Sequence, residues 1–193
     1  ISQAFLRATR TTFKESRNKD YIKYGDDNKY PDYLTYLFNK SAKHSAIVSG
    51  KAFYIFGEGY ENGEVVVNRL GDTLNDVSKR AILDIEIYGG FRWEIIWNAA
   101  RKVQEIYHVD YTTIRVGKNG GYYFKECWDI NDREEEVFMP AFNPNSPVGS
   151  QLYAYNEYRP KTKYYPLPEY IGSNNFIETD IEISKYYLSA IRN

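Results

Sequence analysis

The sequence predicts an α+β fold in which about three to four helices pack with an antiparallel β-sheet. Apolar residues recur every three to four positions up to Gly89 and Gly90 and alternate after them, which is a change from helical to strand periodicity. The predicted strands then follow one another through short turns, and short turns join antiparallel neighbours. The length of 193 residues is close to that of one domain and allows one hydrophobic core.

The first predicted elements are an N-terminal arm and two helices. Residues 1–30 end in a turn-forming cluster and are expected to form an arm or a strand pair. Pro31 suits the first turn of a helix, because its missing N–H would have no intrahelical partner there, so a helix is expected over 31–39. A second helix over 41–57 begins at Ser41, whose hydroxyl can cap it. Since apolar residues cover more than half of its circumference, this helix is expected to be largely buried.

A third helix and a strand meet at the pair of glycines. The helix over 73–88 begins at Thr73 as its cap and ends at the glycines. The strand that follows, over 91–97, directs Arg92 and Glu94 to one face. The opposite face is expected to be buried and consists of Phe91, Trp93, Ile95 and Trp97.

The rest of the chain is expected to complete the sheet and to end in a helix. The predicted elements are a strand over 103–109, a hairpin with arms over 112–116 and 122–128, a loop over 129–150 and a strand over 151–158. We expect 91–97, 103–109 and 122–128 to lie in one antiparallel sheet. The last helix has one face formed by Ile177, Ile181, Ser184, Leu188 and Ile191.

The sequence contains no pattern of residues that carries catalysis or binds a metal. His44, His108 and Cys127 are too few for a zinc site, and neither CxxC nor HExxH spacing occurs. The glycines at 117–121 belong to a hairpin turn, because no helix follows them to bind a phosphate. We therefore expect no catalytic residue, no metal and no cofactor, and we expect that the chain is not an enzyme.

Charge and hydropathy exclude two further classes of protein. Lys and Arg number 25 against 26 Asp and Glu, so the net charge of −1 lacks the basic excess of an autonomous nucleic-acid-binding domain. No apolar stretch approaches the roughly 20 residues that span a bilayer, so no membrane association is expected. The single cysteine cannot form an internal disulfide, and synthesis in the cytoplasm is expected.

Tyrosine is the most unusual feature of the composition, with 20 residues in the chain. Tyrosine buries a large ring while its hydroxyl stays hydrogen-bonded, so it suits half-exposed strands and protein interfaces. It also suits platforms that stack sugars. One reading of the chain is therefore a β-rich carbohydrate- or protein-binding module.

Several segments, taken in order, resemble the N-terminal part of tailed-bacteriophage portal proteins, particularly those of phages and prophages of Bacteroidetes. These segments are YGDDNKYP at 24–31, NKSAKH at 39–44, YIFGEG at 54–59, DIEIYGGF at 84–91, IYHVD at 106–110, YPLPEY at 165–170 and DIEIS at 180–184. The resemblance covers nearly the whole chain, although each segment alone is weak.

This resemblance implies a structural subunit of a head-tail connector ring, commonly a dodecamer, at one vertex of the capsid. Such a ring docks the packaging terminase, contacts capsid and neck or tail proteins, and passes double-stranded DNA during packaging and ejection. The implied location is the virion, after assembly in the cytoplasm of the bacterial host. The ATPase belongs to the terminase, so the resemblance implies no enzymatic activity for this chain.

The resemblance also divides the chain and suggests that it is a fragment of a larger portal subunit. Residues 1–30 would be an N-terminal arm, 31–170 a wing-like α+β body, and 171–193 a helix that leads toward a missing stem region. Pro166 and Pro168 prevent regular structure around them, so exposed aromatic rings are expected there. The expected subunit-interface residues are Tyr164, Tyr165 and Tyr170.

Overall fold

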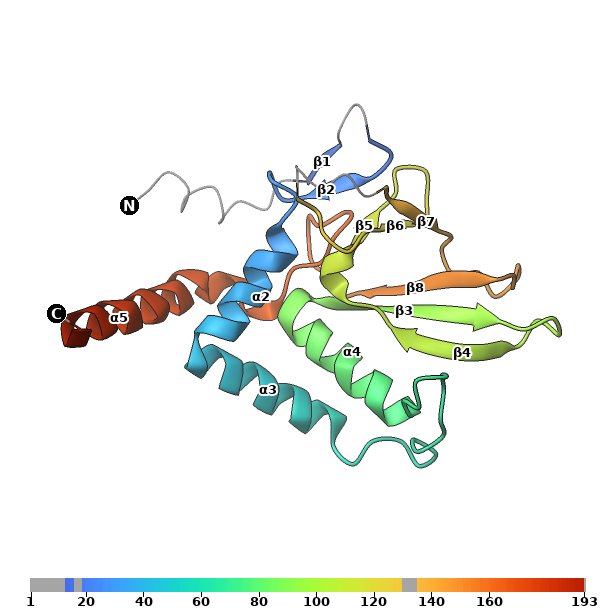
Figure 1. The fold of residues 1–193 in the computed structure, drawn as a ribbon, viewed down its shortest axis with the longest axis horizontal. Coiled ribbons are helices and arrows are strands. Elements are labelled where there is room, and N and C mark those ends of the chain that lie inside the picture. The colour runs from blue at the N-terminus through green and yellow to red at the C-terminus, as the bar shows by residue number, and fades with distance from the viewer. Residues whose placement is uncertain (1–12, 16–18, 130–134, 193) are drawn as a thin grey trace.

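The computed structural model describes residues 13–15, 19–129 and 135–192, and it has the predicted α+β fold (Figure 1). Its helices are α2 (Tyr30–Lys40), α3 (Ala42–Phe56), α4 (Leu74–Tyr88) and α5 (Asn174–Arg192), with the short 3-10 helices η1 (Tyr111–Thr113) and η2 (Glu169–Ser173). Its strands are β1 (Phe13–Glu15), β2 (Ile22–Tyr24), β3 (Gly90–Trp97), β4 (Val103–His108), β5 (Ile114–Val116), β6 (Tyr122–Phe124), β7 (Val137–Met139) and β8 (Ser150–Asn156).

Local capping chemistry sets the helix boundaries where the sequence predicts them. Pro31 lies in the first turn of α2, and the Ser41 side chain accepts a hydrogen bond of 3.2 Å from the backbone N–H of His44 at the start of α3. Thr73 and Asp76 cap α4 reciprocally, which satisfies two backbone donors at once. Gly89 ends α4 at φ +85°, a conformation that favours glycine.

The strands form two three-stranded antiparallel sheets in the described part of the chain, besides the β1–β2 pair. The strand orders are β4-β3-β8 and β5-β6-β7. The expectation that 122–128 lies in one sheet with 91–97 and 103–109 is therefore wrong, because β6 pairs with β5 and with β7 in a separate sheet. Strand β7 lies within residues expected to form a loop, and β6 ends at Phe124. Beyond it the chain turns inward, and the Trp128 indole N–H donates to the carbonyl of Thr113 at 2.9 Å.

Strand β3 does not have a single buried face. Arg92, which was expected on the exposed side, is 1% exposed, whereas Trp93 and Trp97 are only half-buried. The guanidinium of Arg92 is satisfied inside the protein, since it donates to the Tyr155 carbonyl at 2.9 Å and to the Asn156 side-chain oxygen at 2.8 Å. These hydrogen bonds allow a charged side chain to take a core position.

Helix α3 is also less buried than its composition suggests. In this helix only His44, Val48 and Ala52 are buried, while Tyr54 is 86% exposed. The helix packs one side against α2 and α4, and most of its remaining residues are exposed. The expectation of a largely buried helix is therefore wrong, because the apolar residues that surround α3 exceed what one neighbouring layer can cover.

Tyrosine rings fill the centre of the main core. Tyr24 of β2 stacks on Tyr165 with ring centroids 4.0 Å apart, and Tyr88 of α4 stacks on Tyr111 at 4.6 Å. Some of the buried hydroxyls donate to backbone carbonyls, for example that of Tyr24 to the carbonyl of Pro166 at 2.8 Å. Strand β2, from the segment expected to be an arm, thus packs into the same core as α2 and α4.

A second buried arginine, Arg115 of β5, links its own segment of the chain to Asn28 through hydrogen bonds. Its guanidinium donates to the side-chain oxygen and to the carbonyl of Asn28, at 2.8 and 2.6 Å, and to the carbonyls of Thr112 and Ile114. It also lies over the ring of Trp128. Burial lowers the pKa of Arg115 from its usual value, yet the four hydrogen bonds compensate its desolvation.

The buried hydrogen bonds of Arg115 predict the effect of its removal. Arg115→Met keeps the length of the side chain but leaves several buried acceptors without a donor, at about 1–3 kcal/mol each. We expect the free energy of unfolding, measured by urea denaturation, to fall by about 3 kcal/mol or more. Arg101→Met, at an exposed turn, is the matched control and should change little. Equal midpoints for the two variants would contradict this role of Arg115.

Candidate assembly surface

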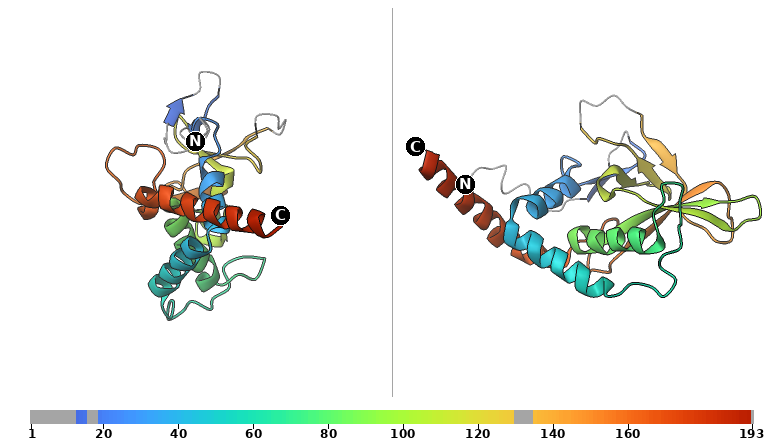
Figure 2. Two further views of the ribbon diagram at one scale, coloured as in Figure 1. Left: turned by 90° about the vertical axis from the view of Figure 1, so that its left-hand side faces the viewer. Right: turned by 60° about the horizontal axis from the view of Figure 1, so that its bottom comes forward.

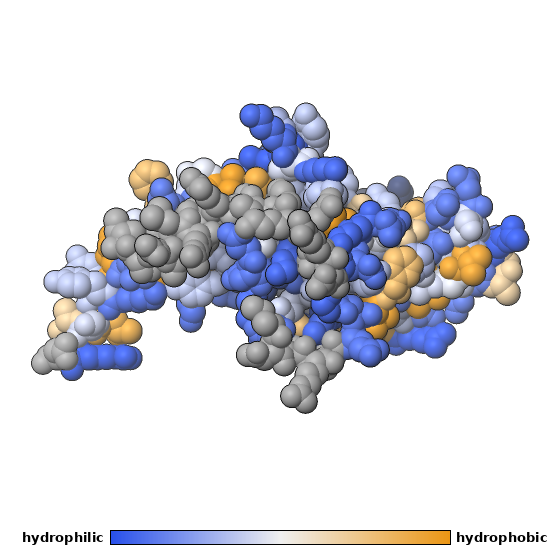
Figure 3. Space-filling model, turned by 90° about the horizontal axis from the view of Figure 1, so that it is seen from above, coloured by the Kyte–Doolittle hydropathy of each residue, from blue (hydrophilic) through white to orange (hydrophobic). Residues whose placement is uncertain are grey.

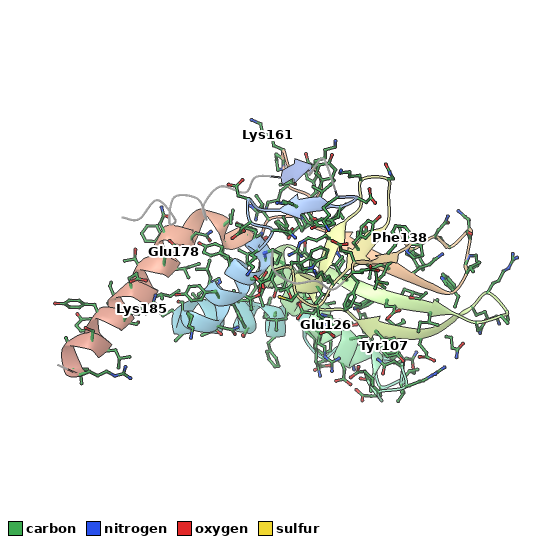
Figure 4. All side chains as sticks on the ribbon, turned by 45° about the horizontal axis from the view of Figure 1, so that its top comes forward. Tyr107, Glu126, Phe138, Lys161, Glu178 and Lys185 are labelled. Atoms are coloured by element: carbon green, nitrogen blue, oxygen red, sulfur yellow. The ribbon has the colours of Figure 1, made fainter. Side chains whose placement is uncertain are left out.

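Helix α5 leaves the body of the protein after its first two turns. Ile177 and Ile181 are buried against Leu37 of α2, and every residue from 182 to 192, the projecting half, is exposed. Figures 1 and 2 show this half extending away from the rest of the chain. The Lys185 ammonium donates to the Tyr36 hydroxyl at 3.1 Å, on the side of α5 turned toward α2 (Figure 4).

The projecting half is unusually apolar for a helix in solvent. Its large exposed side chains are Ile183, Tyr186, Tyr187, Leu188 and Ile191. Ile183, Tyr187 and Ile191 follow one another at intervals of four residues and form one row, which we call the α5 ridge. Figure 3 shows apolar side chains at the tip of α5. An isolated helix of this length is marginal in water, so a partner that covers the ridge would stabilise it.

The outer side of α3 offers a second apolar surface. Ala46, Ser49 and Gly50 are small and exposed, and a methyl group added at Gly50 would meet nothing within 4 Å. Larger exposed side chains border these three residues: Ile47 on one side, and Phe53 and Tyr54 toward the end of the helix. We call the small residues and their border the α3 patch.

A hollow of about 490 Å³ lies where α3 begins and α5 leaves the body. Its lining includes Ile47 of α3 and Phe176 and Ile183 of α5. At its edge Asp180 accepts hydrogen bonds from the Lys43 ammonium and the Ser41 hydroxyl, both at 3.0 Å. These bonds hold the pKa of Asp180 below its usual range. The hollow therefore lies at the junction of the α3 and α5 surfaces.

His44 forms part of the wall of this hollow. Its side chain is 6% exposed, its Nε2 has no hydrogen-bond partner among the described residues, and its ring meets that of Tyr170 edge to face at 4.2 Å. Burial lowers the pKa of His44, because the protonated form would lose its hydration. His44 is therefore neutral near pH 7.

The three tyrosines predicted at a subunit interface differ in position. Tyr165 is 2% exposed and stacks in the core, so the premise that its ring is exposed is wrong. Its hydroxyl donates to the Ile22 carbonyl and accepts from the backbone N–H of Val116. Tyr164 and Tyr170 are half-buried, and the Tyr170 hydroxyl donates to the carbonyl of Ile87 at 2.8 Å. An interface role for these residues remains a prediction.

Sequence reasoning missed the residues of the α5 ridge and the α3 patch as surface candidates. It assigned Ile191 to one face of the last helix and treated α3 as a core helix. The signal was present in the composition, because both helices carry more apolar residues than a single contact face requires. Periodicity alone did not reveal which of these residues the fold leaves uncovered.

The aromatic residues of β3 and β8 form a separate cluster rather than a flat platform. Phe91 packs against Trp93 and Tyr155 with interplanar angles of 55° and 26°, and Trp93 meets Tyr153 at 38°. The rings therefore cover one another's faces. This arrangement does not favour the reading of the chain as a module that stacks sugars.

The residues considered as catalytic or metal-binding groups form hydrogen bonds to different side chains. His108 and Asp84 form a hydrogen bond of 2.8 Å, and the thiol of Cys127 donates to Asp129 at 3.2 Å. Within the described residues, no three or more His, Cys, Asp or Glu side chains gather in a way that could hold a metal ion. None of the helices described combines the length and the apolar character needed to cross a membrane.

Comparison with solved structures finds the same fold in chains of gene transfer agent particles. A chain from the neck of an empty gene transfer agent particle, computed with C6 symmetry, matches 83% of this chain with a TM-score of 0.59 and 12% identity. A chain from the virion of a native gene transfer agent particle matches 83% with a TM-score of 0.56 and 14% identity. Our chain spans less than half of each, 46% and 45%. Searches against protein-family models and curated proteins found no match.

The burial of His44 predicts a dependence of stability on pH. As pH falls through the ordinary histidine value of 6.5, the unfolded chain binds a proton that the folded chain does not, so the fold loses stability. His44→Phe keeps a ring in place and should reduce the loss of melting temperature between pH 7.5 and 5.5. Tyr170→Phe is the control, which should lower stability but leave the pH slope unchanged. An unchanged slope in His44→Phe would be evidence against a buried neutral imidazole.

Proposed function

We propose that this chain belongs to a structural subunit of a phage portal, the ring at a capsid vertex through which double-stranded DNA is packaged and ejected. The observation that carries the proposal is the fold shared over 83% of the chain with components of a gene transfer agent particle. The ordered sequence segments that resemble portal proteins support the same conclusion independently of the fold. The subunit would be located in the virion after assembly in the host cytoplasm.

The exposed surfaces of the chain support a role in assembly. A closed ring needs two different surfaces on each subunit, because every copy contacts one neighbour through each of them. The α5 ridge and the α3 patch are two such surfaces, on different helices of one chain. Contiguous apolar surface of this kind on a soluble protein marks an interaction site.

The charge of the chain fits a passage for DNA better than a binding site for it. The net charge of −1 provides little of the phosphate pairing that would hold sliding DNA in place. The further partners proposed are the packaging terminase, which would supply the ATPase activity, and capsid and neck or tail proteins. The subunit itself is proposed to have a structural and not an enzymatic role.

Inactivation of the gene in a host that produces particles tests this proposal. Without the ring there is no vertex at which DNA enters, so we expect empty heads without tails in electron micrographs and loss of nuclease-protected DNA. A wild-type copy supplied in trans should restore both. The protein should also be found by mass spectrometry in purified wild-type particles. Particles with normal DNA content and tails in the mutant would refute the proposal and favour a binding module.

A further inference from the structure

Helix α5 carries, near its root, a buried carboxylate with one oxygen that lacks a partner among the described residues. We propose that residues 1–12 of the same chain, which lie outside the described residues, bind along the face of α5 that contains Glu178 and Glu182. In this contact the guanidinium of Arg7 donates to the second oxygen of Glu178. Phe5 and Leu6, which precede Arg7, cover apolar residues of the α5 ridge beside it.

The carboxylate of Glu178 is buried without a cation. Glu178 is 9% exposed, and the Tyr33 hydroxyl donates to its Oε1 at 2.6 Å. Its Oε2 is buried as well and has no hydrogen-bond partner among the described residues. None of the ion pairs within the described part of the chain includes Glu178. A buried charge is costly unless it is paired, so a cationic donor that reaches Oε2 is favoured.

A hollow of about 430 Å³ lies along α5 at this carboxylate. The described residues that line it all belong to α5 and are Glu178, Thr179, Glu182, Ile183, Tyr186 and Tyr187. Two carboxylates therefore lie beside apolar side chains, and the Lys185 ammonium, 2.7 Å from Glu182, neutralises one of them. Glu178 lies near the root of α5 and Lys185 farther along the helix (Figure 4). The hollow thus suits a segment that combines a cation with apolar side chains.

Residues 1–12 have this combination of side chains. The segment contains two arginines, Arg7 and Arg10, and no Asp or Glu, so its side chains carry a net charge of +2. Phe5 and Leu6 come directly before Arg7. A guanidinium presents five N–H donors in a planar fork, which matches a carboxylate better than an ammonium does. The charge and the apolar character of the segment are therefore complementary to those of the hollow.

The chain enters β1 on the side of the body where α5 is attached. In the antiparallel pair of β1 and β2, the first residue of β1, Phe13, lies opposite the last residue of β2, Tyr24. The chain that leaves Tyr24 turns directly into α2 (Figure 1), and Leu37 of α2 packs against the root of α5. Residues 1–12 therefore join the strand pair at the end that leads to α2 and α5.

Two tyrosines of α2 separate this end of the strand pair from Glu178. The ring of Tyr24 lies 5.3 Å from that of Tyr30, which in turn lies 5.8 Å from that of Tyr33. The Tyr33 hydroxyl then contacts Glu178 at 2.6 Å. Together with the spacing between paired strands, these steps place Glu178 within about 25 Å of Phe13.

The position of Arg7 in the sequence matches this distance. Arg7 comes six residues before Phe13, which allows about 20 Å of extended chain, and its long side chain adds to the reach. Arg10 comes three residues before Phe13 and has about 10 Å of extended chain. Arg7 is therefore the better match to Glu178.

The contact leaves the tip of α5 uncovered. Leu188 and Ile191 do not line the hollow, so they stay available to a neighbouring subunit in the ring proposed above. The segment therefore fixes the direction in which α5 projects without occupying the whole α5 ridge.

Hydrogen exchange in α5 tests the pair of Arg7 and Glu178. Arg7→Ala should raise the amide exchange rates of residues 178–188 by about tenfold, because this part of the helix opens more often without the contact. Glu178→Gln keeps an acceptor for Tyr33 but loses the charge, so in that background Arg7→Ala should change the rates by less than about twofold. Arg10→Ala removes the same charge from the same segment and is the matched control, with a smaller expected effect.

The exchange rates can contradict the pair in several ways. Equal rates in the wild type and in Arg7→Ala would overturn it. A rise that persists unchanged in the Glu178→Gln background would also overturn it, because Arg7 would then act elsewhere. An effect of Arg10→Ala as large as that of Arg7→Ala would show a general effect of charge and would refute the assignment to Arg7.

A cysteine pair tests where the segment lies. In a Cys127→Ser background, Leu6→Cys with Ile183→Cys should form a disulfide within one chain on mild oxidation, detected by mass spectrometry of the digested monomer band. Leu6→Cys with Phe53→Cys is the matched control, because Phe53 is 77% exposed but lies on α3, and it should not cross-link. Equal cross-linking of both pairs, or linkage of the first pair in dimers alone, would overturn the proposed contact. Both measurements are made on the single subunit, so their outcome does not depend on ring formation.

Discussion

Two buried guanidinium groups hold this fold together in places where no β-ladder can. Arg115 and Arg92 donate mainly to backbone carbonyls and amide oxygens, and neither has a carboxylate within salt-bridge distance among the described residues. The sheets are small and the connections between them are irregular, so many buried carbonyls lack a backbone donor. Arginine brings five donors to one point and thereby satisfies several carbonyls at once. The buried tyrosine rings pack around these two arginines. Several tyrosine hydroxyls also donate to buried carbonyls.

This arrangement also determines where the candidate assembly surface lies. Arg115 fixes the turn at Asn28, which leads directly into α2. Helix α2 in turn holds the root of α5 through Leu37, and α3 follows α2 after the single residue Ser41. The core thus sets the positions of both helices but covers only one side of each. The uncovered sides face away from the sheets and remain available to other molecules.

Local signals predicted the helices well, because capping residues act within a few positions of the chain. Ser41, Thr73 and Gly89 set helix ends through contacts that the sequence itself displays. The division of the strands into two sheets depends on distant partners, and the sequence has no local sign that β6 joins β7. Tyr165 shows the same limit, since the nearby prolines suggested an exposed ring, whereas the ring packs in the core, where it stacks on Tyr24. The candidate surface was missed because periodicity identifies the apolar faces of a helix. It does not show which of these faces the rest of the fold covers.

The exposure of the projecting half of α5 affects how strongly a partner could bind it. Its backbone hydrogen bonds face water, and beyond the Lys185 contact with Tyr36 it has little to hold it among the described residues. Such a segment opens at low free-energy cost, far below that of global unfolding. Any partner that covers it must therefore supply the cost of ordering it, which weakens each single contact. Contacts of modest strength dissociate and reform, so in the ring proposed above misplaced subunits would be released until many correct contacts act together.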